Sequence, residues 1–336
     1  MNDRHIRRRR AAGLAAGCLL LLLGMIASVR FGATHYSWSV AWDAMFHYDE
    51  NVSDQIIVRT TRVPRAFIAA AIGASLAIAG AMMQALTRNP LASPSVLGVN
   101  AGASFVVVLA SLIFSVSSMH ALMWLAFAGA AMASAVVYIL GSLGRGGLTP
   151  MKLVLAGAAM TALFSSFTQG ILVVNQKGLN TVLYWLTGTV AGRSPDMLLI
   201  VLPYMLLCLI GAWVVARDLN VLMMGEETSR SLGQKTVWLK ASIGLMIVIL
   251  AGGAVSVAGP IGFIGVVVPH IGRFFSGTDH RWLIPYCAVL GALLLVAADL
   301  AARFIMIPEE VPVGVMTALI GVPFFFYIAR RGGIQS

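Results

Sequence analysis

The sequence Pro64-Arg-Ala-Phe-Ile-Ala-Ala-Ala-Ile-Gly-Ala-Ser-Leu-Ala-Ile-Ala-Gly-Ala-Met-Met-Gln-Ala-Leu86 has one charged residue, near its start, and is otherwise apolar, small or uncharged. A helix of this length can cross the hydrocarbon core of a bilayer, which takes about 20 residues. Comparable apolar runs recur at approximately residues 11–29, 64–86, 96–114, 121–143, 152–174, 197–216, 237–258, 261–272, 282–300 and 311–329. The sequence therefore predicts an all-α polytopic membrane protein with about ten transmembrane helices.

The composition of the chain excludes a soluble globular protein. Hydrophobic residues make up 59% of the 336 residues and charged residues only 11%, and the mean hydropathy is +0.88. We expect a basic cytoplasmic tail at 1–10, a single transmembrane domain at 11–336 and no soluble domain. The net charge of +10 comes from basic residues in the short gaps between apolar runs. Membrane topology explains those residues, so membrane lipid is an expected partner and nucleic acid is not.

The eighth apolar run decides the topology. Between Pro260 and Pro269 only about ten residues can form straight helix, so this run is either a separate short helix or part of a bent seventh span. With ten spans and both termini in the cytoplasm, most of the 23 lysines and arginines lie in inner segments. Merging the two runs weakens this asymmetry, so we expect ten spans. The outer segments then carry Asp43, Asp49, Glu50, Asp54, Asp196, Asp299, Glu309 and Glu310.

Two glycine-bounded segments, Gly73–Gly80 and Gly252–Gly259, are similar in sequence. The ten-span topology runs the first inward and the second outward. The match therefore predicts an inverted repeat, by which many transporters build two alternating states. Chance similarity is the alternative, because small residues recur often in membrane helices.

The sequence carries no pattern typical of catalysis. It contains no Walker A, G-x-S-x-G or HExxH motif and no histidine pair at helical spacing. We therefore expect a chain that is not an enzyme and holds no metal and no cofactor. Ionisable residues are scarce in the middle of the spans, and the nearest candidate, Asp299, is at a helix end. This scarcity argues against an ion-coupled carrier that works alone, while a membrane anchor for partner proteins is a further alternative.

The most polar inner segment covers approximately residues 217–240. Glu226 to Leu232 can form two helical turns with acidic residues at the N-terminal end, and Gly233 supplies a stop. The segment is either a solvated loop or a docking helix for a cytoplasmic partner.

A set of motifs occurs in order along nearly the whole chain. They are Arg62-Val-Pro-Arg65, Gly80-Ala-Met-Met-Gln84, Arg88-Asn-Pro-Leu-Ala-Ser-Pro94 with Leu97-Gly98, Gly225-Glu226 with Leu232-Gly233, Gly259-Pro-Ile-Gly-Phe-Ile-Gly265 with Pro269-His270-Ile-Gly-Arg273, and Pro312-Val-Gly314 with Gly321-Val-Pro323. With these motifs the chain resembles the iron-siderophore, haem and cobalamin permeases of type II ATP-binding-cassette importers.

This resemblance implies a permease subunit in the bacterial cytoplasmic membrane. A second permease copy or a paralogue would complete a central pathway. Two cytoplasmic ATPase subunits would bind ATP and magnesium, and an extracytoplasmic substrate-binding protein would deliver the substrate. The segments Arg88 to Asn100 and Pro150 to Leu153 look most like those of siderophore members, so we expect an iron chelate as substrate. Haem and cobalamin remain alternatives within the family.

The resemblance also assigns three groups of site residues. The family's docking arginines for the binding protein correspond to Arg62, Arg65 and Arg303, although arginines at such positions can also be interfacial anchors. The ATPase-coupling residues correspond to Gly225, Glu226, Glu227, Ser229, Arg230, Leu232 and Gly233. The inner gates correspond to Asn89, Pro90 and Leu91 and, in a second loop starting at Thr149, to Pro150 and Met151. In that second loop some family members carry small polar residues instead.

Overall fold

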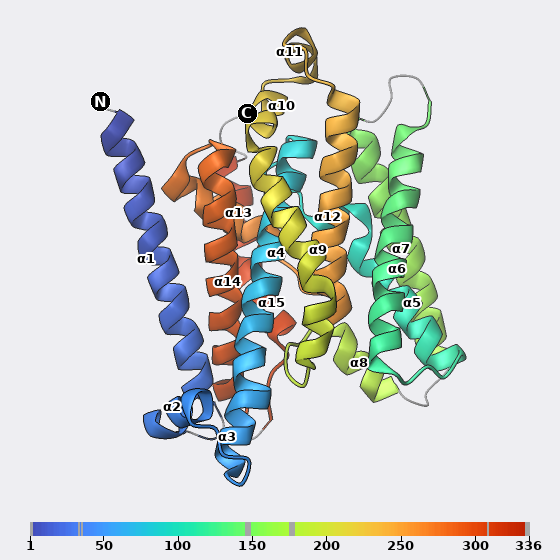
Figure 1. Cartoon of the computed structure of the whole chain (residues 1–336). Helices are drawn as coiled ribbons and strands as arrows, with labels where there is room; N and C mark the ends of the chain where they lie inside the picture. Colours follow the sequence, from blue (N-terminus) through green and yellow to red (C-terminus); the bar gives the residue numbers. More distant parts are fainter. Residues whose placement is uncertain are drawn as a thin grey trace.

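The computed structural model describes residues 3–32, 34, 36–144, 149–174, 179–307 and 309–332, and every regular element in these ranges is helical (Figure 1). The outermost positions of the expected tail and domain, 1, 2 and 333–336, lie outside this part. The α-helices are α1 (Asp3–Arg30), α2 (Trp38–Phe46), α3 (Ser53–Ile57), α4 (Val63–Thr87), α5 (Val99–Val108), α6 (Met119–Ser142), α7 (Pro150–Val174), α8 (Leu179–Leu186), α9 (Pro195–Val214), α10 (Ala216–Met223), α11 (Glu226–Ser231), α12 (Thr236–Ala258), α13 (Ile264–Ser276), α14 (His280–Ile305) and α15 (Val313–Gly332).

Seven of these helical stretches are long and apolar enough to cross a membrane, and three further apolar helices are shorter. The shorter ones are Val99–Ile113, Ile264–Ser276 and Val313–Ile328. Together they coincide with the ten apolar runs of the sequence. The chain is therefore an all-α, multi-pass membrane protein, as predicted.

The first helix begins earlier than the first apolar run. The basic residues expected as a tail belong to α1 from Asp3 onward, because arginine is a good helix former and no glycine or proline interrupts residues 3–10. Only 6% of the apolar window of α1 is buried, so this helix lies at the edge of the bundle.

The eighth run forms a separate short helix. The helix α12 ends at Ala258, and Gly259 adopts a φ of 75°. A Cβ at this position would also overlap the carbonyl oxygen of Trp185, so both the turn and the close approach require glycine. The chain then turns back, and α13 begins at Ile264.

The third run is likewise a short helix that follows a sharp turn of the backbone. Arg88 ends α4 in the left-handed conformation with a φ of 51°. The chain then turns back beside α13, where the Cδ of Pro94 would lie 3.0 Å from a Cβ on Gly265. A short 3-10 turn, η2 (Pro94–Leu97), leads through Gly98 into α5. The third span is therefore a short helix preceded by irregular backbone within the bundle.

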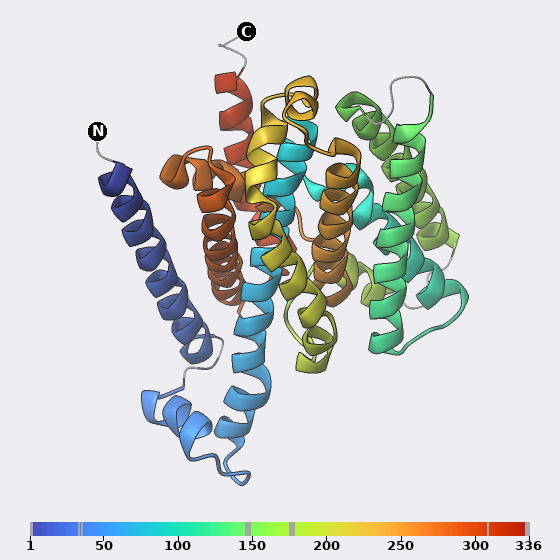
Figure 2. The ribbon, with the colours of Figure 1, turned by 45° about the horizontal axis from the view of Figure 1, so that its top comes forward.

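The two halves of the chain pack as an inverted repeat predicts. The helices α4 and α12 run in opposite directions, and each is followed by a turn and a short helix (Figures 1 and 2). In addition, α4 packs on α14, the third helix of the half that begins with α12, and α12 packs on α6, the third helix of the half that begins with α4. A Cβ on Gly73 of α4 would overlap the carbonyl oxygen of Gly291 in α14, and a Cβ on Gly252 of α12 would lie 3.4 Å from Ala130 in α6.

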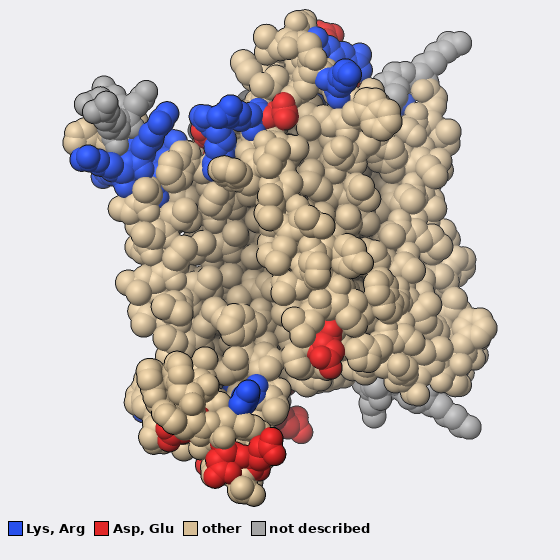
Figure 3. All heavy atoms as spheres, viewed as in Figure 1, with Lys and Arg blue, Asp and Glu red and all other residues tan. Residues whose placement is uncertain are grey.

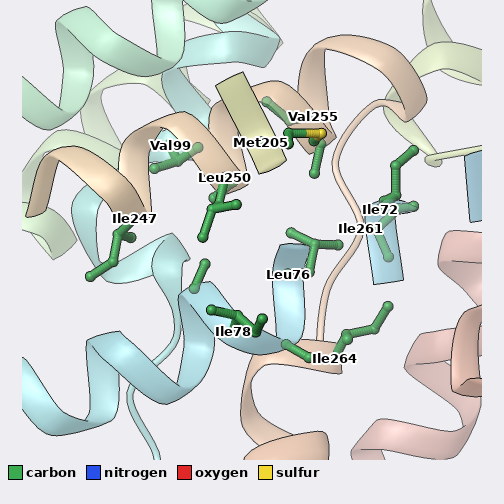
Figure 4. Packing of buried hydrophobic residues seen from close by; sticks show 14 of the residues in the cluster. Ile72, Leu76, Ile78, Val99, Met205, Ile247, Leu250, Val255, Ile261 and Ile264 are labelled. Atoms are coloured by element: carbon green, nitrogen blue, oxygen red, sulfur yellow. The ribbon is translucent and has the colours of Figure 1, made fainter. Parts of the chain in front are cut away.

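The core lies where α4 and α12 cross near the short helices (Figure 4). The buried side chains include Ile72, Leu76 and Ile78 from α4 and Ile247, Leu250 and Val255 from α12. The apolar window of α4 is 83% buried, which makes α4 the central helix. The backbones come close because small residues face each other: a Cβ on Gly80 would overlap the carbonyl oxygen of Gly265.

Candidate functional site

The two ends of the helix bundle differ in charge (Figure 3). Lysine and arginine side chains gather at the end that carries α11 and the N-terminus of α1, whereas acidic side chains gather at the end that carries α2 and α3. The middle of the visible face shows neither. This separation matches the inner and outer segments that the sequence predicts.

At the basic end, α11 is fixed by an ion-pair network centred on Glu226. Lys240 of α12 donates a hydrogen bond from Nζ to Glu226 Oε2 at 2.6 Å, and Arg230 Nη2 donates to Glu226 Oε1 at 2.7 Å. The hydrogen bond from Lys240 lowers the pKa of the Glu226 carboxyl below its ordinary value. The buried Ser229 hydroxyl donates to the carbonyl oxygen of Val221 at 3.0 Å, which ties α11 to α10.

The two glycines that bound this segment both have positive φ values. Gly225 has a φ of 117° and Gly233 a φ of 80°. The helix itself ends at Ser231, with Leu232 as its C-terminal cap. The side chains of Glu227 and Leu232 are exposed beside it. The structure therefore brings all seven predicted coupling residues together on one protruding turn, which suits a docking role.

The first predicted gate segment lies next to this turn. A Cβ on Gly225 would lie 4.0 Å from Nη1 of Arg88, the residue that ends α4. The next residue, Asn89, accepts a hydrogen bond at Oδ1 from the amide of Leu91 at 2.9 Å, which forms a compact turn around Pro90. Asn89 and Pro90 are exposed and Leu91 is half-buried.

The second predicted gate segment begins α7. Pro150 is the first residue of this helix, and Met151 beside it is 70% exposed. The amide of Leu153 donates to the carbonyl oxygen of Thr149 at 3.1 Å. Two turns further along α7, a Cβ on Gly157 would overlap the carbonyl oxygen of Val96. The backbone at Val96, which follows the first gate segment, therefore packs closely against α7, the helix that begins at the second gate segment.

At the acidic end, the three predicted docking arginines lie in one network. Arg65 Nη2 lies 2.7 Å from Oδ1 of Asp299, and Arg65 Nη1 lies 2.7 Å from Oε2 of Glu310. Asp299 also pairs with Arg303 one turn along α14. Asp299 and Arg303 are almost fully buried, with 1% and 2% of their surface exposed.

The same network holds the end of α1. Arg303 Nη1 donates to the carbonyl oxygen of Ser28 at 2.7 Å and to that of Phe31 at 3.1 Å. Arg62 Nη1 donates to the Phe31 carbonyl at 2.7 Å and Arg62 Nη2 to that of Thr34 at 2.9 Å. Arg62 and Arg65 are half-buried and Arg303 is inside the protein. The docking role stays a prediction, and the visible role of Arg303 is to hold helices together.

A further polar feature faces outward from the bundle. A hollow of about 360 Å³ is lined by Asn100 and Ser104 of α5 and by Thr161, Ser165 and Gln169 of α7. The three α7 residues recur every four positions and form one stripe along the helix. Such side chains are unfavourable against lipid tails.

A comparison with protein families identifies the chain. Residues 20–331 match the FecCD transport family. The chain belongs to this family. The match covers the second half of the apolar run in α1, the nine other apolar helices, both predicted gate segments and the α11 turn.

Individual proteins that are similar to this chain support its assignment to this family. The probable siderophore transport system permease protein YfiZ of Bacillus subtilis (strain 168) is 53% identical over 317 residues, covering 94% of this chain and 95% of that protein. The iron(3+)-hydroxamate import system permease protein FhuB of the same organism is 44% identical over 319 residues, covering 95% and 83%. A metal-chelate type ABC transporter in an inward-facing conformation has a TM-score of 0.84 at 27% identity, covering 96% of this chain and 99% of that one. The chain is therefore a transport permease subunit.

Two features of the site were not predicted from the sequence. Asp299 and Glu310 were expected in outer segments, but their pairing with the arginines was not. The spacing of Asp299 and Arg303, four residues apart on one helix, could have indicated that pair. The polar stripe on α7 could likewise have been found from the spacing of Thr161, Ser165 and Gln169.

Proposed function

We propose that this chain is the membrane-spanning subunit of an ATP-driven importer that carries a ferric siderophore across the bacterial cytoplasmic membrane. The names of its relatives, which include siderophore and iron-hydroxamate permeases, support this substrate class. The observation that carries the proposal is the polar stripe of α5 and α7, because it gives the bundle an outward-facing surface suited to water and not to lipid.

The stripe fits a pathway that two subunits share. Thr161, Ser165 and Gln169 lie on the outside of one chain, so they can line a water-filled path only if a second copy or a paralogue covers them. Short hydroxyl and amide side chains offer weak hydrogen bonds without fixed charge. A large polar chelate can therefore pass without being held tightly.

The protein partners follow from the two ends of the bundle. The α11 turn protrudes from the basic end and presents Glu227 and Leu232 to a pair of cytoplasmic ATPase subunits, which would bind ATP and magnesium. The gate segments at Asn89 and Pro150 lie at the same end and would open and close as α11 moves. By the positive-inside rule, this end and both chain termini are cytoplasmic.

A substrate-binding protein would dock at the opposite end. Arg62 and Arg65 are half-buried there, and Glu310 already supplies Arg65 with a carboxylate. A docking protein that presents carboxylates could therefore add to or replace the contact of Glu310. Arg303 would act by holding Asp299 and α1 beneath this surface.

The test is uptake in bacterial cells that lack their own chelate permeases. The chain is expressed with its ATPase and binding protein, and the cells receive radioactive ferric hydroxamate, haemin or cobalamin. We expect ATP-dependent uptake of the ferric hydroxamate. The double variant Ser165→Leu, Gln169→Leu should abolish that uptake without loss of the assembled complex.

The matched control is the double variant Leu163→Ile, Phe167→Leu, which alters exposed apolar residues of the same helix and should transport normally. Uptake of haemin or cobalamin in place of the iron chelate would show that the proposed substrate is wrong and that the chain carries a different class of substrate. Uptake on a proton gradient without the ATPase would overturn the proposal.

A further inference from the structure

A second cavity, unrelated to the polar stripe, opens at the basic end of the bundle. It has a volume of about 700 Å³ and lies between the start of α1, the α9–α10 junction and the start of α14. Arginines from all three elements line it: Arg7, Arg217 and Arg281. Its size is within the usual range for a small-molecule site.

The position of α1 keeps this cavity open. The helix diverges from the bundle toward its N-terminus (Figure 2). It is attached to α14 where the Tyr286 hydroxyl donates to the carbonyl oxygen of Arg10 at 2.8 Å. A Cβ on Gly13 would overlap the same hydroxyl, so the two helices approach closely at this level. The cavity is therefore a wedge with fixed walls.

In each of the three walls, the arginine lies nearer the basic end of the bundle than the apolar residues do. In α1, Arg7 lies two turns closer to the basic end than Leu14. At the α9–α10 junction, Arg217 lies one turn closer to that end than Trp213. In α14, Arg281 lies one turn closer than Pro285, which also faces the cavity. The wedge is thus basic at its mouth and apolar toward the middle of the membrane.

Two tryptophans mark the boundary between these zones. Trp213 and Trp282 both line the cavity, and tryptophan is enriched at the level of lipid headgroups, where its ring is half in water. The basic mouth therefore lies at the depth of the phosphates of the inner leaflet, and Leu14 and Pro285 lie at the depth of the acyl chains.

The positive charge of this mouth is only partly neutralised. Arg281 Nη2 pairs with Asp279 Oδ2 at 2.7 Å, and Asn220 of α10 donates to Asp279 Oδ1 at 2.7 Å. Among the described residues no carboxylate pairs with Arg7 or Arg217. Two guanidinium groups without a carboxylate partner and one that is shared with Asp279 thus line the cavity.

We propose that this wedge binds one anionic glycerophospholipid. Arg7, Arg217 and Arg281 hold the phosphate, since guanidinium groups match phosphate geometry with paired hydrogen bonds. The rings of Trp213 and Trp282 flank the glycerol esters, and an acyl chain follows the apolar wall.

The site is placed to influence the α11 turn. Arg217 is in α10, and the Ser229 hydroxyl hydrogen-bonds to the carbonyl oxygen of Val221 in the same helix. The bond between Asn220 and Asp279 joins α10 to α14 beside the cavity. A bound lipid therefore braces α1, α10 and α14 against one another directly behind α11.

Lipid selectivity of the purified chain tests this proposal independently of transport. The chain is reconstituted in bilayers of mixed phosphatidylcholine and phosphatidylglycerol, and the lipids retained after mild delipidation are counted by native mass spectrometry. Wild type should retain phosphatidylglycerol selectively. The triple variant Arg7→Gln, Arg217→Gln, Arg281→Gln should lose about tenfold or more of this selectivity.

A matched control separates the site from general surface charge. The triple variant Arg8→Gln, Arg9→Gln, Lys235→Gln removes the same charge from exposed positions at the same end and should keep wild-type selectivity. An Arg-to-Lys version of the site variant should keep most of it, because the charge is retained. Equal loss in the control, or no loss in the site variant, would overturn the proposal.

Two further measurements use the unaltered chain. A phosphatidylglycerol with a photoreactive acyl chain should cross-link to peptides that contain Leu14 or Pro285, and labelling elsewhere only would contradict the site. Inorganic phosphate and glycerol phosphate should not displace the lipid at equal concentration. If they do, the cavity binds free phosphate and the assignment to a lipid is wrong.

Discussion

At the scale of single residues, Asp299 has the most demanding environment in the molecule. Its carboxylate faces the guanidinium groups of Arg65 and Arg303, and all three are removed from bulk solvent to different degrees. A buried charge is tolerated only when it is paired. Glu310 balances the second arginine charge from the loop between α14 and α15. Ion pairs thus join α4, α14 and that loop, and the hydrogen bonds of Arg303 to backbone carbonyl groups add α1 to the network.

Replacing Asp299 with asparagine should therefore destabilise the whole bundle. The substitution keeps the shape of the side chain but leaves Arg303 without its buried counter-charge, a loss of about 3–5 kcal/mol. The measurement is the thermal unfolding midpoint of the purified protein in detergent. Asp43→Asn serves as the control, because the Asp43 carboxylate is exposed and lies 3.8 Å from the imidazole of His47, and such a pair contributes about 0–1 kcal/mol. Equal midpoints for the two variants would show that the network does not stabilise the fold.

This network also shows the limit of prediction from one sequence. The pair of Asp299 and Arg303 follows from helical spacing alone. The pair of Arg65 and Asp299 does not, because it joins residues from opposite ends of the chain and depends on α4 packing against α14. The sequence therefore placed Arg65, Asp299 and Arg303 at the same end of the bundle, but it did not predict that they face one another.

At the scale of elements, hydrophobic runs predicted the position of every long helix. Their length alone could not decide whether a span continues through a turn, because apolar side chains suit both a straight and a broken span. The decisive features were backbone conformations, such as the left-handed Arg88 and the positive φ of Gly259. These conformations are stabilised by neighbouring helices and are visible only once the helices are packed. The start of α1 at Asp3 was missed for a related reason, since charged residues can extend a helix beyond the membrane.

The attachment of α11 to α12 should depend on pH in one direction. The folded-state pKa of Glu226 is below its ordinary value of 4.5, so the contact with Lys240 is fully present above the ordinary pKa. It is lost as pH falls through the lowered value, because the protonated carboxyl no longer attracts Lys240. A spin label on Ser231→Cys, in a Cys18→Ser background, should therefore be ordered at pH 7 and become mobile at acidic pH.

Two variants check this assignment. Lys240→Met should leave the label mobile at pH 7, since Glu226 then loses its partner on α12. Glu227→Gln changes the neighbouring exposed acid and should keep the wild-type profile. A label that stays ordered through the acidic range in the wild type would show that α11 is held by backbone contacts and the Ser229 hydroxyl alone.

At the scale of the whole molecule, charge and packing divide the chain in different ways. Packing relates the halves that begin with α4 and α12 as oppositely directed units, so the two ends of the bundle are built from similar elements. Charge makes these ends different, with arginine and lysine at one and aspartate and glutamate at the other (Figure 3). A repeat of this kind builds the two ends from similar elements, and the charge asymmetry distinguishes one end from the other in the membrane.

The orientation of the bundle follows from the same asymmetry. Short loops rich in lysine and arginine stay in the cytoplasm, so Lys235 beside α11 should be inside and Asn51 between α2 and α3 should be outside. Single cysteines at these exposed positions, in a Cys18→Ser background, can be treated with a membrane-impermeant maleimide in intact cells. Asn51→Cys should be labelled at once and Lys235→Cys only after the membrane is permeabilised, while the buried Cys208 and Cys287 should stay unlabelled in both cases. The opposite pattern would place α11 outside the cell, where no ATPase could reach it, and would overturn both the topology and the proposed mode of energy supply.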